Sequence, residues 1–286
     1  MEKVETYSIE KQRQIFVQPV TNADFFIVEV KQHPNIEEPY RAESYAIGFL
    51  KCGSIEMQTG LHVSTVNAPT ILAIGPSVIR SFTKASTDME MDIIFFKADF
   101  FLENQANVFF LKKFVFFETT GQHDRKLNLE QSDHFASLFQ LIKDIFQRKN
   151  KHYPSIIRSY LYALIYEMDA IVNVNQQSEV HLNPLFEKFR ELLSKEFLRQ
   201  RSVGFYADHL NVSRKYLSEV IKKYTGKTAG DWIDEVVVLE AKVLLQDKSL
   251  TINQISDQLN FSNQSIFGRF FKTVAGLSPL DYRKKF

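Results

Sequence analysis

The chain has 286 residues, of which 44% are hydrophobic and 24% are charged, and its formal net charge is +1. These values are typical of a globular protein long enough for two domains. We predict neither a membrane span nor a secretory signal, because no apolar run is long enough and the first residues are polar. The lone cysteine, Cys52, argues against an internal disulfide and a cysteine-cluster metal site, so a cytoplasmic protein is expected.

The first hundred residues predict β-structure. Residues 1 to about 30 are expected to form an extended lead-in, with strands at 15–20 (IFVQPV) and 24–30 (DFFIVEV). From residue 40 to about residue 96, short apolar runs alternate with turn residues, and two predicted strands join at residues 52–54. Many short strands with few helices predict an antiparallel sandwich or barrel.

Motifs for catalysis or metal binding are missing from the sequence. His33 and His62 are isolated, without a second histidine or a glutamate at ligand spacing. There is no Ser/His/Asp pattern and no glycine-rich phosphate loop. We therefore predict that the protein is not an enzyme and that it needs no cofactor and no metal.

Phenylalanine is concentrated between Phe95 and Phe117, where nine of the 26 Phe lie within 23 residues. In one interpretation, paired rings wedge a short helix (about residues 98–105) and a loop against the β-structure. In the other, the same rings line a pocket for an apolar or aromatic effector. The structural interpretation is favoured, because aromatic clusters are more often part of a core than of a ligand site.

Two amphipathic helices are predicted next. Apolar residues recur at helical spacing from Phe135 to Phe146 and again from Ile157 to Met168, and Pro154 begins the second helix. The pair could close the β-structure or could bind a second subunit. Residues 173–183 are polar and lack periodicity, which is typical of a linker between domains.

The two halves of the chain differ in charge. From Asn183 onward, 17 Lys/Arg stand against 12 Asp/Glu, a balance of +5, whereas the remaining residues have a balance of −4. A basic segment joined to an acidic one fits a DNA-binding half and a half with another role. The basic half is expected to begin with a helix at Pro184.

The basic half contains the same helix-turn-helix pattern twice. Positions before the turn recur 49 residues later and positions after it recur 50 residues later, so the second turn has one extra residue. The matched pairs include Tyr206/Ile255, Ala207/Ser256, Asn211/Asn260, Leu217/Phe267 and Ile221/Phe271. An offset that persists across a turn indicates a repeated structural unit.

The residues of the first copy predict its local structure. Asn211 tolerates the left-handed backbone of a tight turn, and Ser213 can cap the helix that follows. Apolar residues face the core on one side of that helix, and polar or charged residues occupy the other side. Such a helix is slim enough to enter a major groove of DNA.

The polar faces of both second helices are the predicted DNA contacts. Arg suits guanine and Gln suits adenine in the major groove, whereas Lys suits phosphates. The candidate base-contacting residues are Arg214, Lys215, Ser218, Glu219, Gln264, Ser265 and Arg269. The candidate phosphate-contacting residues are Lys222, Lys223, Asn263 and Lys272. Two alternatives stay open: Glu219 could merely balance lysine charge, and Arg269 could contact phosphate.

A connecting helix of residues 228–246 is predicted between the copies, with Thr228 and Asp231 as a capping pair and Trp232, Val236, Leu239, Val243 and Leu244 facing the core. It would be some 27 Å long at about 1.5 Å per residue. That length could hold two recognition helices about one DNA turn, roughly 34 Å, apart.

The segments LNVSRKYLSEVIKKYTG, DWIDEVVVLEAKVLLQ and LNFSNQSIFGRFFKTVAGLSPLDYR resemble the DNA-binding domain of AraC/XylS-type transcriptional regulators. The resemblance covers roughly the last hundred residues. It implies a cupin-like sensing domain before them and dimerisation through adjacent helices. The chain departs from the family pattern at four positions. Ser256 stands where the family mostly has Ala, and Gly268 lies inside a recognition helix. Val237 and Glu219 stand where Arg is frequent.

We therefore predict an α+β protein. A cupin-like antiparallel β-barrel or sandwich with a helical pair (1–175) precedes a linker (176–183) and an all-α domain (184–286) with helix-turn-helix units at about 203–225 and 251–274. The predicted function is sequence-specific DNA binding in transcriptional regulation. The alternative is a cupin-type enzyme or metal-binding protein with an accessory DNA-binding domain.

The predicted partners are double-stranded DNA, a possible small-molecule effector, a second copy of the chain and, for an activator, RNA polymerase. No membrane partner is expected. The sequence does not indicate which residues would bind an effector.

Overall fold

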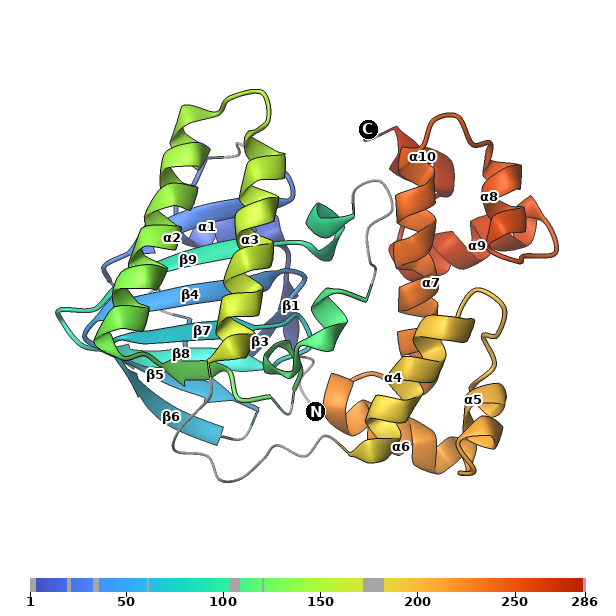
Figure 1. Ribbon diagram of the computed structural model, residues 1–286, viewed down its shortest axis with the longest axis horizontal. Helices are drawn as coiled ribbons and strands as arrows, with labels where there is room; N and C mark the ends of the chain where they lie inside the picture. Colours follow the sequence, from blue (N-terminus) through green and yellow to red (C-terminus); the bar gives the residue numbers. More distant parts are fainter. Residues whose placement is uncertain are drawn as a thin grey trace. The chain divides into compact units, whose positions relative to one another are not determined.

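The computed structural model describes residues 4–19, 22–32, 36–60, 62–102, 109–119, 121–171 and 183–284. The chain forms two compact units (Figure 1). The first, the β-rich unit, comprises residues 1–100 and 114–179, and the second, the helical unit, comprises 101–113 and 180–286. Residues 101–113 thus belong to the helical unit, although the division predicted at 176–183 assigns them to the sensing domain.

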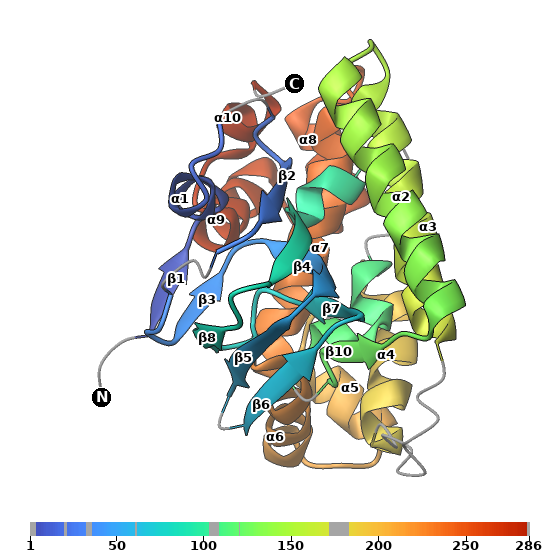
Figure 2. The same cartoon turned by 90° about the vertical axis from the view of Figure 1, so that its left-hand side faces the viewer.

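The β-rich unit contains two five-stranded sheets. In one sheet the strand order is β1 (Glu5–Tyr7), β3 (Tyr40–Ala42), β8 (Arg80–Ala85), β5 (Ser54–Thr59) and β6 (His62–Asn67). In the other it is β10 (Asp124–Lys126), β7 (Thr70–Ile74), β4 (Tyr45–Cys52), β9 (Glu90–Phe96) and β2 (Phe25–Val30). Every pairing among the described strands is antiparallel except that of β1 with β3. The predicted antiparallel sandwich is confirmed, with two sheets rather than a closed barrel (Figure 2).

Two helices cover the outer face of the second sheet: α2 (Leu129–Arg148) and α3 (Tyr153–Ala170) (Figure 1). The Phe139 ring of α2 lies 5.7 Å from the Phe49 ring of β4, and Lys143 Nζ lies 2.9 Å from Asp92 Oδ2 of β9. Covered on both faces, β4 is buried over six consecutive residues rather than alternating. The apolar stripes of α2 and α3 are therefore largely used within this unit.

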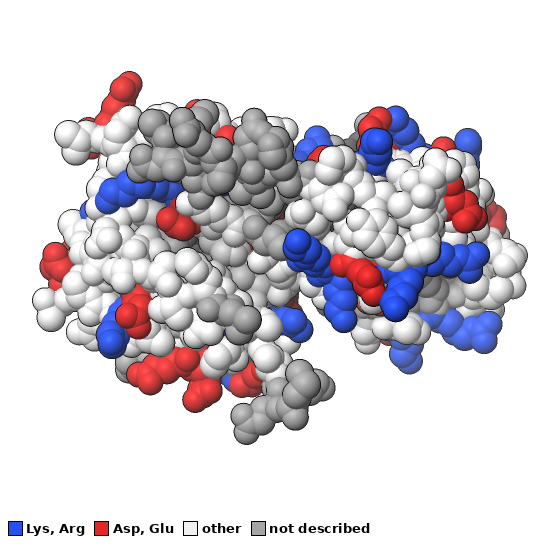
Figure 3. All heavy atoms as spheres, turned by 90° about the horizontal axis from the view of Figure 1, so that it is seen from below, with Lys and Arg blue, Asp and Glu red and all other residues white. Residues whose placement is uncertain are grey.

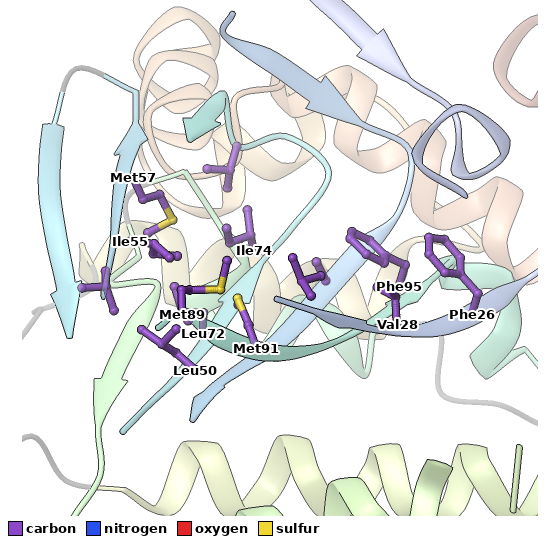
Figure 4. Packing of buried hydrophobic residues seen from close by; sticks show 14 of the residues in the cluster. Phe26, Val28, Leu50, Ile55, Met57, Leu72, Ile74, Met89, Met91 and Phe95 are labelled. Carbon is purple, nitrogen blue, oxygen red and sulfur yellow. The ribbon is translucent and has the colours of Figure 1, made fainter. Parts of the chain in front are cut away.

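The core of the β-rich unit lies between the sheets (Figure 4). Its residues share an inward orientation on alternate positions of their strands, as the pleat requires. They include Phe26, Val28, Leu50, Ile55, Met57, Leu72, Ile74, Met89, Met91 and Phe95. The strands β4 and β5, which join at residues 52–54, lie in different sheets, so this turn carries the chain from one layer to the other.

The strand predicted at residues 15–20 was wrong. Ile15 is the last residue of helix α1 (Ile9–Ile15), and Phe16 and Val17 form a turn. Ser8 begins α1 by accepting a hydrogen bond from the Lys11 amide at 3.1 Å. The polar residues that follow are good helix formers, and Ile9 is buried in the core between the sheets. The predicted strand at 24–30 is confirmed as β2.

The Phe-rich segment forms three short 3₁₀ helices: η1 (Ala98–Phe101), η2 (Leu111–Lys113) and η3 (Val115–Phe117). The short helix predicted at 98–105 corresponds to η1, and residues 103–108 lie outside the described part of the chain. Eight of the nine Phe are buried: Phe95, Phe96, Phe100, Phe101, Phe110, Phe114, Phe116 and Phe117. This burial supports the structural interpretation of the cluster.

The helical unit contains seven described helices: α4 (Pro184–Glu196), α5 (Val203–His209), α6 (Arg214–Thr225), α7 (Ala229–Gln246), α8 (Ile252–Gln258), α9 (Gln264–Ala275) and α10 (Pro279–Arg283). These confirm the predicted all-α domain. The predicted linker at 176–183 lies outside the described residues except for Asn183, which caps α4. None of the described helices is long and apolar enough to cross a membrane.

Candidate nucleic-acid interface

The two helix-turn-helix copies, α5–α6 and α8–α9, share one backbone plan. Asn211 and Asn260 occupy the left-handed region at the two turns, with φ of 55° and 54°. Each recognition helix, α6 or α9, ends at a left-handed glycine, Gly226 or Gly276. The repeat predicted from the sequence is therefore a repeat of backbone conformation.

Side-chain caps begin both recognition helices. Ser213 accepts a hydrogen bond from the Tyr216 amide at 3.1 Å, as predicted. Asn263 does the same for the Ile266 amide at 2.9 Å, so it precedes α9 as its cap and its Oδ1 is already bonded. Of the Asn263 side-chain atoms, only Nδ2 remains able to donate a hydrogen bond to a phosphate.

The small residues at the helix crossings are equally buried in the two copies. Ala207 and Ser256 are completely buried at matching positions of α5 and α8. The Ser256 hydroxyl has no hydrogen-bond partner within the described residues. A buried hydroxyl without a partner costs free energy, so the second copy carries a penalty that the first lacks.

The helix α7 connects the copies and has the predicted cap. Thr228 accepts from the Asp231 amide at 3.2 Å, while an Asp231 carboxylate oxygen accepts from the Thr228 amide. The buried face is wider than predicted and includes Leu245, whereas Leu244 is only half-buried. This widening arises because α6, α8, α9 and α10 all pack against α7.

The exposed face of α6 carries the first group of candidate DNA contacts. Arg214, Lys215, Ser218, Glu219 and Lys222 line one open groove together with residues of neighbouring helices. Lys223 is exposed on the same helix. Figure 3 shows Lys and Arg side chains gathered on the surface of the helical unit, on the right of that view.

Two of these α6 side chains lie against other groups of the protein. The Arg214 guanidinium covers Gly204 of α5, where an added Cβ would lie 2.6 Å from Nη2. Lys215 Nζ lies 4.0 Å from Glu219 Oε1, one helical turn away. That distance favours the interpretation in which Glu219 balances lysine charge, although both side chains are well exposed and the pair is weak.

The exposed face of α9 differs in chemistry. Gln264, Ser265, Arg269 and Lys272 are all exposed. The Arg269 side chain makes no ion pair with any described residue. Gly268 lies among them, and a Cβ added there would meet nothing within 4 Å. The second face is therefore shallow at its centre and has one uncommitted guanidinium.

The contacts that hold the second turn, between α8 and α9, were not predicted from the sequence. The Arg201 guanidinium lies 3.7 Å from the centre of the Phe261 ring and donates to the Leu259 carbonyl. Asn260 Nδ2 donates to the Leu198 carbonyl at 3.1 Å. The segment between α4 and α5 thus holds the turn between α8 and α9, which couples the two copies through a path other than α7.

Two residues of the segment 101–113, Leu102 and Lys112, contact α7. Glu235 Oε2, in the first half of α7, lies 3.2 Å from Lys112 Nζ and 2.7 Å from Lys227 Nζ. Burial raises the pKa of Glu235, but the two ammonium groups outweigh it and lower this pKa to about 2. At the C-terminal end of α7, Gln246 Nε2 donates to the Leu102 carbonyl at 2.7 Å. No local sequence pattern signals contacts between residues so far apart in the chain.

Residues 206–285 match a protein family described as a helix-turn-helix domain. The Msm operon regulatory protein of Streptococcus mutans is 24% identical over 86% of this chain and 86% of its own length. The F1 operon positive regulatory protein of Yersinia pestis is 30% identical over 37% of this chain and 34% of its own. The domain match and these relatives support the resemblance to AraC/XylS-type transcriptional regulators.

The similarity to these proteins has two parts. The helix-turn-helix match covers residues 206–285, and the chain spans about a third of the F1 operon relative. The Msm relative extends the likeness over both units. The crystal structure of ToxT from Vibrio cholerae O395 covers 92% of this chain and 98% of its own, at 13% identity and a TM-score of 0.37.

Proposed function

We propose that this AraC/XylS-type chain is a transcriptional regulator that binds a specific DNA sequence with two recognition helices. The observation that carries the proposal is the repeated backbone plan on one connecting helix. With 18 residues, α7 is about 27 Å long at about 1.5 Å per residue. This length suits recognition helices in successive major grooves, which are separated by roughly 34 Å.

The candidate contacts divide by chemistry. Arg269 and Gln264 on α9 are exposed and can each bond two atoms of a base edge. Lys222 on α6 and Lys272 on α9 occupy matching positions in the last turns of their helices, where ammonium groups suit phosphates. In this arrangement α9 supplies most of the base readout, because Arg269 makes no ion pair with a described residue. On α6, by contrast, Arg214 lies over Gly204 and Lys215 lies near Glu219.

Residues 184–286 form the DNA-binding domain in this proposal, and the β-rich unit is the sensing domain. A small-molecule effector bound by the β-rich unit shifts the population of chains competent to bind DNA. Homodimers form through the exposed apolar residues of α2 and α3, among them Leu129, Leu141 and Tyr166. RNA polymerase is the further partner where the chain activates transcription.

DNA selection with the full-length protein tests the proposal. Fragments retained from genomic DNA should share a sequence with two recognition elements about one helical turn apart. Affinity for that sequence should exceed the affinity for unrelated DNA by about a thousandfold or more. Retention of fragments without a shared sequence would contradict specific recognition.

A variant pair tests the phosphate contacts. Lys222→Ala combined with Lys272→Ala should weaken binding to all DNA alike and lower the salt slope by about two, roughly 0.9 for each phosphate. Lys195→Ala is the matched control, since Lys195 is equally exposed but pairs with Glu191 on α4, outside both copies. An unchanged slope in the double variant would remove these residues from the interface.

A further inference from the structure

The space between the two sheets is incompletely filled. A narrow cavity of about 50 Å³ lies within the core of the β-rich unit. Its walls are apolar side chains, including those of Ile55, Leu72, Ile74, Met91 and Phe95 (Figure 4).

One charged side chain lines this apolar cavity. Arg80, at the start of β8, is 1% exposed. Its Nη1 donates to the Gly75 carbonyl at 2.9 Å, and the guanidinium carbon lies 5.0 Å from the centre of the Tyr40 ring. Its Nη2 is buried and has no hydrogen-bond partner in the described residues. No described carboxylate lies within ion-pair distance of it.

A buried guanidinium in this state is costly for the folded protein. Charges taken from water are normally paired, and an unpaired donor loses its hydration without compensation. Backbone carbonyls and an aromatic ring offset only part of that loss. A ligand carboxylate would satisfy Nη2 by a charge-assisted hydrogen bond and neutralise the guanidinium.

The cavity can adapt its width at one position. Gly48 of β4 lines it, and a Cβ added to Gly48 would lie 2.1 Å from Met91 Cε. The Met91 side chain therefore lies directly over the glycine backbone. Methionine is flexible and changes conformation at low cost, so Met91 and the neighbouring Met89 can move aside for an entering apolar group.

We propose that the β-rich unit binds a small apolar monocarboxylate between its sheets, with the carboxylate on Arg80 and the apolar body against Met89 and Met91. This inference rests on the proposed function in one respect: the ligand is taken to be the effector. The narrow cavity selects an unbranched or flat body. A neutral molecule of the same shape leaves Arg80 unpaired, and a cation is repelled by it.

Calorimetric titration of the full-length protein, without DNA, tests the site. The probes are octanoate, 1-octanol and octylammonium, which share a chain and differ in the charge of the head group. Octanoate should bind about 10- to 100-fold more tightly than octanol, as expected for a hydrogen bond to a charged group. Octylammonium should not bind. These comparisons use the unaltered chain, so they do not depend on how a variant folds.

Two variants then locate the carboxylate. Arg80→Met should reduce octanoate affinity to that of octanol while leaving octanol affinity unchanged. Arg125→Met is the control, because Arg125 is partly buried in the β-rich unit but does not line the cavity. Equal binding of octanoate and octanol, no binding of octanoate, or unchanged octanoate affinity in Arg80→Met would overturn the inference.

Measurements of octanoate binding and DNA binding on the same protein distinguish a failure of this site from a failure of the proposed function. Octanoate binding that depends on Arg80 but leaves DNA affinity unchanged would uphold the site and remove its role as the effector site. Specific DNA binding by a chain that takes up no octanoate would overturn the site and leave the proposed DNA-binding function intact.

Discussion

The two helix-turn-helix copies have the same backbone and different outer surfaces. A left-handed Asn at the turn, a side-chain cap and a terminal glycine recur in both. On the outer faces, however, Glu219 of α6 lies near Lys215, whereas its counterpart on α9, Arg269, makes no ion pair with a described residue. The repeated residues therefore specify the backbone of each copy, whereas the exposed residues between them differ in charge, and these are the proposed DNA contacts.

The largest expected effect concerns the buried positions that the copies share. Leu217 and Phe267 are matched and completely buried. Leu217→Ala should destabilise the helical unit by about 2–5 kcal/mol and Phe267→Ala by about 3–5 kcal/mol, because each leaves a cavity. The fluorescence of Trp232, the lone Trp, in a urea titration reports this unit, since its ring is buried on α7.

Lys215→Ala is the control for both core variants, because Lys215 is almost fully exposed. A loss below about 1 kcal/mol at either core position would break the equivalence of the copies, since truncating a buried Leu or Phe in a packed core normally costs more.

Recognition should be unequal between the copies. Arg269→Ala should cost about 1–3 kcal/mol on the selected DNA sequence and relax the preference at one base pair. Glu219→Ala should change affinity by less than about 0.5 kcal/mol, as is usual for an exposed charge away from specific contacts. Affinities on selected and unrelated DNA across a salt series measure both. Equal losses on both DNAs for Arg269→Ala would identify a phosphate contact instead.

Exchanging the small residues at the helix crossings should have opposite effects. Ser256→Ala removes a buried hydroxyl without a partner and should stabilise the helical unit by about 1 kcal/mol. Ala207→Ser introduces such a hydroxyl into the first copy and should destabilise it by about 1–2 kcal/mol. Urea midpoints followed by Trp232 fluorescence measure both variants. A destabilised Ser256→Ala protein would show that the hydroxyl is satisfied.

The smallest effect is expected at the centre of the α9 face. Gly268→Ala meets no neighbouring atom and should stabilise the helix by up to about 1 kcal/mol. Ser218→Ala at the matching position of α6 should change stability by less, because serine already forms helices better than glycine does. Weaker specific DNA binding by a more stable Gly268→Ala protein would show that the glycine admits close approach of DNA.

The helical unit was the more predictable half, because its signals are local. Asn211 specifies a turn through its left-handed backbone, and Ser213 and Thr228 begin helices through their side chains. Because the pattern occurs twice, the prediction for one copy can be compared with that for the other. The cap at Ser8 was equally local, but the apolar residues of 15–20 suggested a strand and obscured the preceding helix α1. Alternation along β4 was absent because helices cover its second face.

The contacts missed by sequence reasoning are all long-range. Arg201 with Phe261 and Lys112 with Glu235 join residues that no periodicity relates. The cavity residue Arg80 resembles any surface arginine in the sequence, since its burial depends on the packing of two sheets. The candidate DNA contacts were predicted from the exposed faces of the helices and from the spacing of the repeat. The structure adds that Lys215 lies near Glu219, whereas Arg269 makes no ion pair with a described residue.

The chain passes into the helical unit at residue 101, leaves it at residue 114 and enters it again at residue 180. Cleavage between residues 172 and 182 would therefore leave part of the helical unit on the N-terminal piece. The two pieces would still be held by Lys112 on Glu235 and by the Leu102 carbonyl on Gln246. A fragment that begins at Asn183 lacks residues 101–113, so its α7 loses the contacts with Leu102 and Lys112. One cut in the chain between residues 172 and 182 therefore does not separate the two units.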